Sequence, residues 1–301
     1  MDWGAGAPFV YRGSMASTIA YIGFGEAGRA FASAGARAFD RKIRDAALRD
    51  EMLAAFAAAG VDGFEDVAPA LRGAGAAISL VTADEALAAA RDYAPCLPSG
   101  ALWLDMNSVS PDTKRAAAEA IHAAGGRYVD VAIMAPVRPA CRDVPLLASG
   151  PHAEAGLALL AAMGFTRIRK MDGGIGAASA VKMIRSVMVK GIEALTAECL
   201  MAAEAAGVRD EVLASLDASE KPGTWSERAD YNLDRMLVHG LRRAAEMEEV
   251  VKTLDGLGTG SAMSRGTVER QRALGSLGLG SPDGLDAKLR TLTTRTQEKA
   301  A

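Results

Sequence analysis

The feature that most constrains this chain is a glycine-rich turn placed between an apolar strand and a helix. The run TIAYI at 18–22 has the composition of a buried strand, GFGEAG follows directly, and a helix-prone stretch continues to about residue 34. In such a turn Gly23 permits the tight bend, Gly25 lets a phosphate approach the backbone, and Gly28 lets the helix pack against the strand. The start of the helix then offers N–H groups to an anion. The pattern predicts a dinucleotide-binding βαβ unit.

A second strand is expected at 36–39 and ends at Asp40. An acidic residue at this place accepts hydrogen bonds from the adenosine ribose hydroxyls and repels a 2′-phosphate, which favours NAD over NADP. Arg41 and Lys42 follow directly and would attract that phosphate, and Asp40 is also suited to capping the end of the strand. The expected dinucleotide contacts are Gly23, Phe24, Gly25, Glu26, Ala27, Gly28, Asp40, Arg41, Val81, Thr82, Asn107 and Ser108.

Short apolar runs alternate with helix-prone stretches along the first half of the chain. This alternation is typical of an α/β Rossmann domain, a doubly wound and mostly parallel sheet with helices on both faces. The further strands are expected at 36–39, 76–81, 101–105, 128–132, 145–149 and 166–170, with a connection at 60–64 that has room for one more. The helices are expected at 43–59, 84–93, 111–124 and 153–162.

The alternation stops near Asp172, and only helical patterns follow. The longest runs from 175 to about 206 without proline, and others occupy 209–216, 226–255 and pieces between 262 and 300. The sequence therefore predicts a flexible N-terminal extension at 1–16, a Rossmann domain at 17–172 and an all-α substrate-binding and dimerisation domain at 173–301. The helix from 175 is too apolar to stand exposed, which predicts a homodimer that covers it.

The composition excludes several classes of function. With 34 basic and 37 acidic residues the formal net charge is −3, and no stretch builds the basic stripe of a nucleic-acid-binding protein. No uncharged apolar run is long enough to span a membrane, and residues 1–15 do not resemble a secretory signal. Cys96, Cys141, Cys199 and the scattered histidines lack metal-ligand spacing. We expect a cytoplasmic protein with reduced thiols and no metal, whose partner is a small-molecule substrate.

Four segments carry a resemblance to a known family. They are TIAYIGFGEAG at 18–28, LDMNSVSP at 104–111, GGRYVD at 125–130 and GAASAVKMIRS at 176–186. Together they resemble the β-hydroxyacid dehydrogenases, the family of 3-hydroxyisobutyrate and 6-phosphogluconate dehydrogenases. The second half is most similar to an uncharacterised C-terminal domain of phosphogluconate dehydrogenase relatives. The resemblance implies an NAD(P)-dependent oxidoreductase that moves a hydride between nicotinamide and a hydroxyl-bearing carbon.

The resemblance places Lys182 on the family's catalytic lysine, the group that exchanges a proton with the alcohol or carbonyl oxygen. On a helix, Arg185 and Ser186 share its face, at i+3 and i+4. We expect Ser186 to hydrogen-bond the substrate and Arg185 to pair with a carboxylate. The apolar neighbours of Lys182 distinguish it from an ordinary solvated lysine. Asn107 and Ser108 are placed to contact nicotinamide or substrate, and they are equally suited to capping the following helix.

The family's substrate-contacting turn, D-A-P-V-S-G-G, is not intact in this chain. The stretch DVAIMAPVRPA starts at Asp130, and it puts Met134 at the serine if the aspartates are aligned. If residues 135–137 are aligned with A-P-V instead, Arg138 stands there. Both alignments lack the serine and the paired glycines, which indicates a larger or less polar substrate than a small hydroxy acid. From the helical half, His239 is a further candidate for a substrate contact.

Three other functions are compatible with this layout. An imine reductase has the same domains, but those relatives typically lack the lysine, so Lys182 argues against it. A non-catalytic nucleotide-sensing Rossmann protein would bind the dinucleotide without turning over a substrate. An oxidative decarboxylase of a phosphorylated sugar acid needs a phosphate clamp, for which the candidates are Arg185, Arg242 and Arg243.

Overall fold

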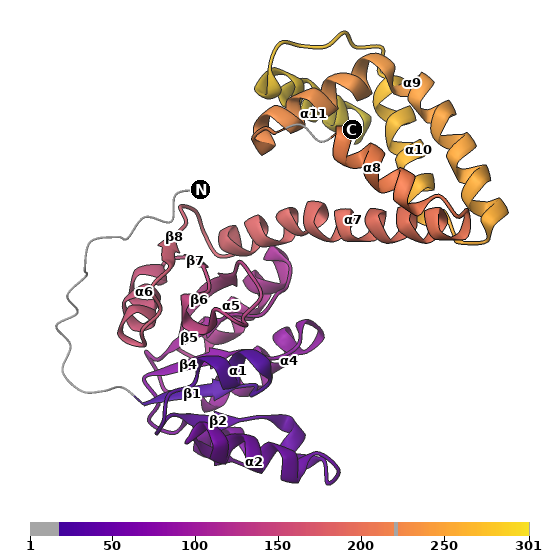
Figure 1. Ribbon diagram of the computed structural model, residues 1–301. Helices are drawn as coiled ribbons and strands as arrows, with labels where there is room; N and C mark the ends of the chain where they lie inside the picture. The colour runs from indigo at the N-terminus through magenta and orange to yellow at the C-terminus, as the bar shows by residue number, and fades with distance from the viewer. Residues whose placement is uncertain (1–17, 220–221, 301) are drawn as a thin grey trace. The chain divides into compact units, whose positions relative to one another are not determined.

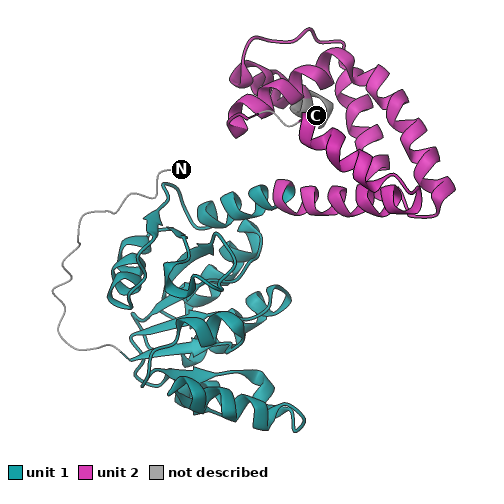
Figure 2. Cartoon of the chain, in the orientation of Figure 1, with its two compact units in different colours: residues 1–187 teal, residues 188–301 magenta. Residues whose placement is uncertain are grey.

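The computed structural model describes residues 18–219 and 222–300, so the extension expected at 1–16 lies outside the described residues. The chain divides into two compact units, residues 1–187 and 188–301 (Figure 2). This division falls within helix α7 (Ala177–Ala205), whereas the sequence predicts a boundary before that helix, at 172. The substrate-binding and dimerisation roles of residues 173–301 stay a prediction.

Unit 1 is built on one eight-stranded sheet in the order β3-β2-β1-β4-β5-β6-β7-β8 (Figure 1). Neighbouring strands are parallel except β6 and β7, which are antiparallel. From β1 the chain runs outward to β3, then returns to the other side of β1 for β4, which confirms the doubly wound Rossmann sheet. The strands are β1 Ile19–Ile22, β2 Arg37–Phe39, β3 Asp62–Phe64, β4 Ala76–Ser79, β5 Leu102–Asp105, β6 Arg127–Ile133, β7 Leu146–Ser149 and β8 Ile168–Lys170.

The helices of unit 1 follow the strands and flank the sheet (Figure 1). They are α1 Glu26–Phe31, α2 Arg49–Ala59, α3 Val67–Leu71, α4 Ala86–Tyr93, α5 Pro111–Ala123 and α6 Ala153–Ala162. The helix expected at 43–59 begins only at Arg49, because Asp40 caps a separate 3-10 turn, η1 (Arg41–Arg44). A polar side chain that bonds the backbone locally competes with continuation of a helix in this way. Helix α1 ends at Phe31 rather than near 34.

The core lies on the sheet, whose central strands are buried on both faces. Trp103, Tyr21 and Tyr128 are among its largest fully buried side chains. Strands covered on both sides show continuous apolar runs rather than alternation, which explains why they stand out in the sequence. The exceptions are fully buried polar residues, among them Asp105 and Asp130, and these lead to the site described below.

Unit 2 is helical, as expected. It contains the rest of α7 with α8 Arg209–Ser219, α9 Trp225–Leu257, α10 Ala262–Gly275 and α11 Leu285–Ala300. The helices α9 and α10 approach closely at Gly240, where a Cβ would clash with the carbonyl oxygen of Gln271. The carboxylate of Glu198 on α7 caps α10 by accepting hydrogen bonds from the backbone of Met263 and Ser264, each at 2.9 Å. Within the described ranges, no helix is both long and apolar enough to cross a membrane.

Candidate functional site

The turn between β1 and α1 has the geometry that the glycine motif predicts. Gly23 has φ +89°, and a Cβ there would lie 2.5 Å from the carbonyl oxygen of Leu80, so a larger residue does not fit. A Cβ on Gly28 would lie 2.7 Å from the carbonyl oxygen of Gly23. At Gly25, the N-cap of α1, a Cβ would meet no atom within 4 Å. The space over Gly25 is therefore open to a ligand.

Asp40 ends β2 and ties the glycine turn to η1. Its Oδ2 accepts a hydrogen bond from the backbone N–H of Phe24 at 2.7 Å, and its Oδ1 accepts one from Lys42 N–H at 3.0 Å. Asp40 thus caps the turn that follows its strand, and since a carboxylate has about four acceptor positions, two remain for other donors. Phe24 offers a ligand neither its N–H, which Asp40 occupies, nor its ring, which is fully buried.

A hollow of about 220 Å³ opens where β1, β2 and β4 end. In open α/β sheets the dinucleotide binds at this topological switch point. The hollow is lined by six of the predicted contacts, namely Gly23, Gly25, Asp40, Arg41, Val81 and Thr82. It is also lined by Lys42, Glu85 and Asp92. Sequence analysis did not identify Glu85 of η2 (Ala83–Glu85) and Asp92 of α4, because only the folded sheet brings these two segments to the end of β2. Among the other predicted contacts, Glu26 is exposed in the first turn of α1.

A second hollow of about 350 Å³ shares Leu80 and Val81 with the first. Its other lining residues include Ala27 of α1, Asn107 and Ser108 after β5, residues 135–137 after β6, and Lys182 of α7. The half-buried Lys182 donates a hydrogen bond from Nζ to Ser108 Oγ at 2.5 Å. The structure therefore brings the predicted lysine and the predicted polar turn to one place beside the glycine motif.

A row of polar side chains crosses the sheet near this hollow. Ser79, Asp105, Asp130 and Ser149 are register partners on β4, β5, β6 and β7, and all are fully buried. Lys114 of α5 is also fully buried, and its Nζ donates to the carbonyl oxygen of Asp105 at 2.6 Å and to its Oδ1 at 2.8 Å. The same Nζ lies 3.4 Å from Asp130 Oδ1. One buried cation therefore stands between two buried carboxylates, an arrangement that buried charges require.

The row also holds the start of α7. Asp130 Oδ2 accepts a hydrogen bond from Ser179 N–H at 3.1 Å, and Asp130 Oδ1 accepts one from Ser179 Oγ at 2.6 Å. Ser149 Oγ accepts one from Ala178 N–H at 3.0 Å. These bonds satisfy N–H groups that have no partner inside the helix. They fix the turn that comes directly before Lys182.

Asn107 is held in place on the other wall. Its Nδ2 donates to Ser79 Oγ at 2.9 Å and to Asp105 Oδ1 at 2.8 Å, and Tyr128 OH donates to Asp105 Oδ2 at 2.7 Å. Burial, and then the Asp105 carboxylate, raise the pKa of Tyr128 well above its ordinary value, so it stays a donor. Asn107 Oδ1 is buried and has no hydrogen-bond partner within the described part of the chain. An unmet acceptor costs about 1–3 kcal/mol, and a nicotinamide carboxamide has the N–H that would meet it. The residues present fit such a cofactor.

The remaining predicted residues lie on α7 and on the segment that follows β6. Ser186 Oγ donates to the carbonyl oxygen of Lys182 at 2.9 Å, a bond within α7. Arg185 is exposed and donates from Nη1 to the carbonyl oxygen of Met134 at 3.4 Å. The side chain of Met134 is buried in a small apolar cluster, so its backbone rather than its thioether reaches this surface. Arg138 is exposed on the loop after β6.

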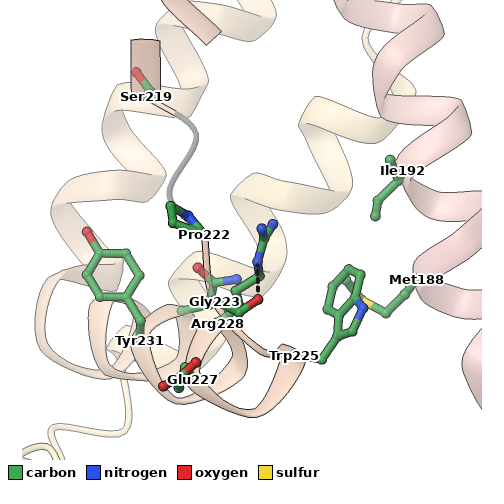
Figure 3. Close-up of a pocket in the computed structure, with 10 residues that line it drawn as sticks. Met188, Ile192, Ser219, Pro222, Gly223, Trp225, Glu227, Arg228 and Tyr231 are labelled. Atoms are coloured by element: carbon green, nitrogen blue, oxygen red, sulfur yellow. Dashed lines mark hydrogen bonds between the residues drawn. The ribbon is translucent and has the colours of Figure 1, made fainter. Parts of the chain in front are cut away.

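Unit 2 has a hollow of its own, of about 630 Å³ (Figure 3). Trp225 and Tyr231 of α9 line it, and they are 62% and 58% exposed. Figure 3 shows the ring of Trp225 beside Met188 of α7, and the guanidinium of Arg228 lies 5.8 Å from the centre of that ring. The predicted His239 is half-buried further along α9 and does not line this hollow. The hollow offers a mixed surface, in which these aromatic and apolar side chains stand beside the charged Glu227 and Arg228.

The fold and the site define a dinucleotide-binding protein of the dehydrogenase and reductase class. Residues 18–164 match the model of the NAD binding domain of 6-phosphogluconate dehydrogenase, and residues 203–274 match a domain of unknown function (DUF1932). The chain belongs to the NAD-binding family that resembles the 3-hydroxyacid dehydrogenases, and it carries both of these domains.

Solved structures agree with this assignment. A conserved hypothetical protein from Sinorhizobium meliloti 1021 is 37% identical, with 94% of this chain and 97% of that chain covered and a TM-score of 0.57. Conserved protein MTH1747, described as structurally similar to 3-hydroxyacid dehydrogenases, is 29% identical, with 87% and 100% covered and a TM-score of 0.54. An imine reductase from Myxococcus stipitatus in complex with NADP+ is 20% identical, with 91% and 99% covered and a TM-score of 0.70, and so shares the fold.

Proposed function

We propose that this protein is an NAD(P)-dependent dehydrogenase or reductase in which Lys182 is the general acid and base. Its reaction moves a hydride between nicotinamide and a hydroxyl-bearing carbon of a small, hydroxy-acid-like substrate. The observation that supports this most directly is the 2.5 Å bond from Lys182 Nζ to Ser108 Oγ, in a hollow that shares the lining residues Leu80 and Val81 with the hollow at the glycine turn. When bound there, nicotinamide supplies or accepts the hydride.

In this proposal Lys182 carries the substrate proton. In the oxidative direction its neutral amine takes the hydroxyl proton, and in the reverse direction its ammonium returns a proton to the carbonyl oxygen. Ser108 keeps Nζ in place by accepting its hydrogen bond. The hydroxyl of Ser186 donates to the helix, so its oxygen remains an acceptor toward the substrate. Asn107 Oδ1 orients the carboxamide of the cofactor.

Arg185 is suited to anchoring an acidic group of the substrate. Within the described residues its one hydrogen bond is the 3.4 Å contact to Met134, which leaves most of the five guanidinium N–H groups for a ligand. It shares the helix face of Lys182 and lies against the loop that lines the hollow. We propose that it binds a carboxylate in a bidentate way, in place of the absent serine and glycines. Arg138, on the same loop, adds a second positive charge.

Nicotinamide fluorescence tests this proposal, first as titrations with NADH and NADPH and then as a turnover screen of hydroxy acids and alcohols. Lys182→Ala is expected to lower kcat by about 10²-fold or more, while the Kd of the cofactor changes little. Lys190→Ala is the matched control, because Lys190 is an exposed lysine further along the same helix. An equal loss of turnover and of cofactor affinity in Lys182→Ala would show that the lysine supports the fold instead.

Imine reduction is the second candidate, because the chain shares its fold with imine reductases. Including cyclic imines in the screen separates the two. If imines are reduced, and Lys182→Ala reduces them as fast as the native protein, the dehydrogenase proposal with its lysine is wrong. Cofactor binding without turnover of any substrate would favour the nucleotide-sensing alternative.

We also infer that the exposed face of α7 pairs with a second copy of the chain. This face carries four exposed apolar side chains. They are Ile184, Val187, Met188 and Ile192, with exposed fractions of 72%, 71%, 47% and 45%. Apolar patches of this kind on a folded protein mark interaction surfaces. Light scattering after size exclusion should give the mass of a dimer, and Ile192→Glu should give that of a monomer. A monomeric native protein would rule the homodimer out.

A further inference from the structure

Two of the residues that line the hollow at the ends of β1, β2 and β4 form an ion pair. One partner is Arg41, which directly follows Asp40 at the end of β2. The other is Glu85, the last residue of the short turn η2 (Ala83–Glu85) between β4 and α4. Arg41 Nη1 lies 2.5 Å from Glu85 Oε2, and both residues line the hollow. The bond to Glu85, and then its charge, raise the pKa of Arg41 above its ordinary value, in keeping with a formed pair.

The charges around this hollow are unevenly balanced. The acidic lining residues are Asp40, Glu85 and Asp92, and the basic ones are Arg41 and Lys42. Three negative and two positive charges give a formal sum of −1. Replacing Glu85 with a neutral residue would bring that sum to zero and release the guanidinium.

NAD and NADP differ at this place by one group. NAD presents a neutral 2′-hydroxyl, which donates to a carboxylate such as that of Asp40. NADP presents a 2′-phosphate, whose strongest partner would be a guanidinium. In this chain the guanidinium of Arg41 is already paired with Glu85, so a phosphate bound to its other N–H groups would lie close to the carboxylates of Glu85 and Asp40, which repel it.

We propose that Glu85 sets the dinucleotide selectivity of this protein by holding Arg41 in an ion pair, so that the hollow accepts the ribose diol of NAD and disfavours the 2′-phosphate of NADP. This inference rests on the proposed function and makes its cofactor specific. Its position beside Asp40 suggests that Arg41 binds the 2′-phosphate and favours NADP. In this proposal Arg41 is instead held by Glu85 and does not favour NADP.

The pair is well suited to a test because it lies on the surface. The side chains of Arg41 and Glu85 are 59% and 31% exposed, and ion pairs of this kind contribute only about 0–1 kcal/mol to stability. Glu85→Gln is therefore expected to fold normally. The matched control is Glu51→Gln, which removes the carboxylate of another exposed pair, that with Arg29 at 3.3 Å.

Dissociation constants for NADH and NADPH, measured by nicotinamide fluorescence at one ionic strength, test the proposal. The native protein should bind NADH more tightly. Glu85→Gln should strengthen NADPH binding about tenfold while the NADH constant stays within about threefold. The double variant Glu85→Gln/Arg41→Ala should lose the gain for NADPH, and Glu51→Gln should match the native protein.

Three results would overturn the role of Glu85. They are tighter binding of NADPH by the native protein, an unchanged NADPH to NADH ratio in Glu85→Gln, and a gain for NADPH that persists without Arg41. Failure of the native protein to bind either dinucleotide would overturn the proposed function itself, and the role of Glu85 with it, so the two failures are distinguishable.

Discussion

Replacing Lys114 with Met removes one charge from the polar row across β4–β7 and keeps most of the side-chain volume. In the native protein Lys114 Nζ is fully buried, donates to Asp105 and lies 3.4 Å from Asp130. Without that ammonium, two buried carboxylates remain at paired positions of β5 and β6. Removing one partner of a buried ion pair typically costs about 3–5 kcal/mol. We expect the free energy of unfolding of unit 1 to fall by about that amount.

Urea unfolding measures this loss. The fully buried Trp103 on β5 reports on the sheet of unit 1, and replacing the other two tryptophans, Trp3 and the exposed Trp225, with Phe in every protein compared leaves its fluorescence alone. Lys170→Met is the matched control, because Lys170 pairs with Glu154 at 2.6 Å on the surface, 46% exposed. Exposed pairs are worth about 0–1 kcal/mol, so this variant should remain close to the native protein.

A loss below about 1 kcal/mol in Lys114→Met would refute the reasoning, since it is the value expected for a solvated lysine. The double variant Lys114→Met/Asp105→Asn separates charge from packing. It removes one of the two carboxylates that the missing ammonium leaves behind, so it should regain part of the stability. If it regains nothing, the loss comes from packing around the side chain of residue 114.

Two further predictions concern the glycine turn and unit 2. Gly25→Ala should change the free energy of unfolding by no more than about 0.5 kcal/mol, because the added Cβ meets no atom within 4 Å. The same variant should weaken NADH binding in the fluorescence titration, because its methyl group would occupy the space that the pyrophosphate needs. For Glu198, burial opposes ionisation, but hydrogen bonds from the Ser264 hydroxyl and from the backbone of Met263 and Ser264 lower its pKa below the ordinary 4.5. A depressed pKa stabilises the folded state above the unfolded value, and this stabilisation is lost as the pH falls through the folded value. Thermal melts should therefore show Glu198→Gln below the native protein at neutral pH and a smaller gap in strongly acidic solution; a gap that does not change with pH would contradict this.

Much of unit 1 could be predicted because its signals are local. Each central strand is a short apolar run, and the glycine turn needs only its neighbours in the sequence to be recognised. Local signals also mislead where side chains intervene. The apolar content of 43–59 indicates one helix. Asp40, however, caps the separate 3-10 turn η1, which includes Ile43 and Arg44, and α2 begins only at Arg49.

The polar row could not be predicted, because the contacts that make it are long-range. Asp105 and Asp130 each look like a strand residue near a turn, and Lys114 looks like a solvated residue on a helix. Fully buried lysines and aspartates are rare unless paired, and the pairing depends on the register of β5 with β6. The same holds for Glu85, which is far from Arg41 in sequence and meets it only because β2 and β4 lie on the two sides of β1 in the sheet.

Lys182 differs from a solvated helix lysine because the segments that carry Lys182 and its hydrogen-bond partner Ser108 are both fixed to the sheet. On its own side, α7 starts on Asp130 and Ser149, so the turn before Lys182 is fixed to β6 and β7. On the other side, Ser108 follows β5, whose end is held by the bonds from Lys114 to Asp105. Because Lys114 also faces Asp130, one buried ammonium connects both sides. The backbone segments that carry Lys182 and Ser108 are thus both held by the sheet, which suits the proton transfer that we propose for Lys182.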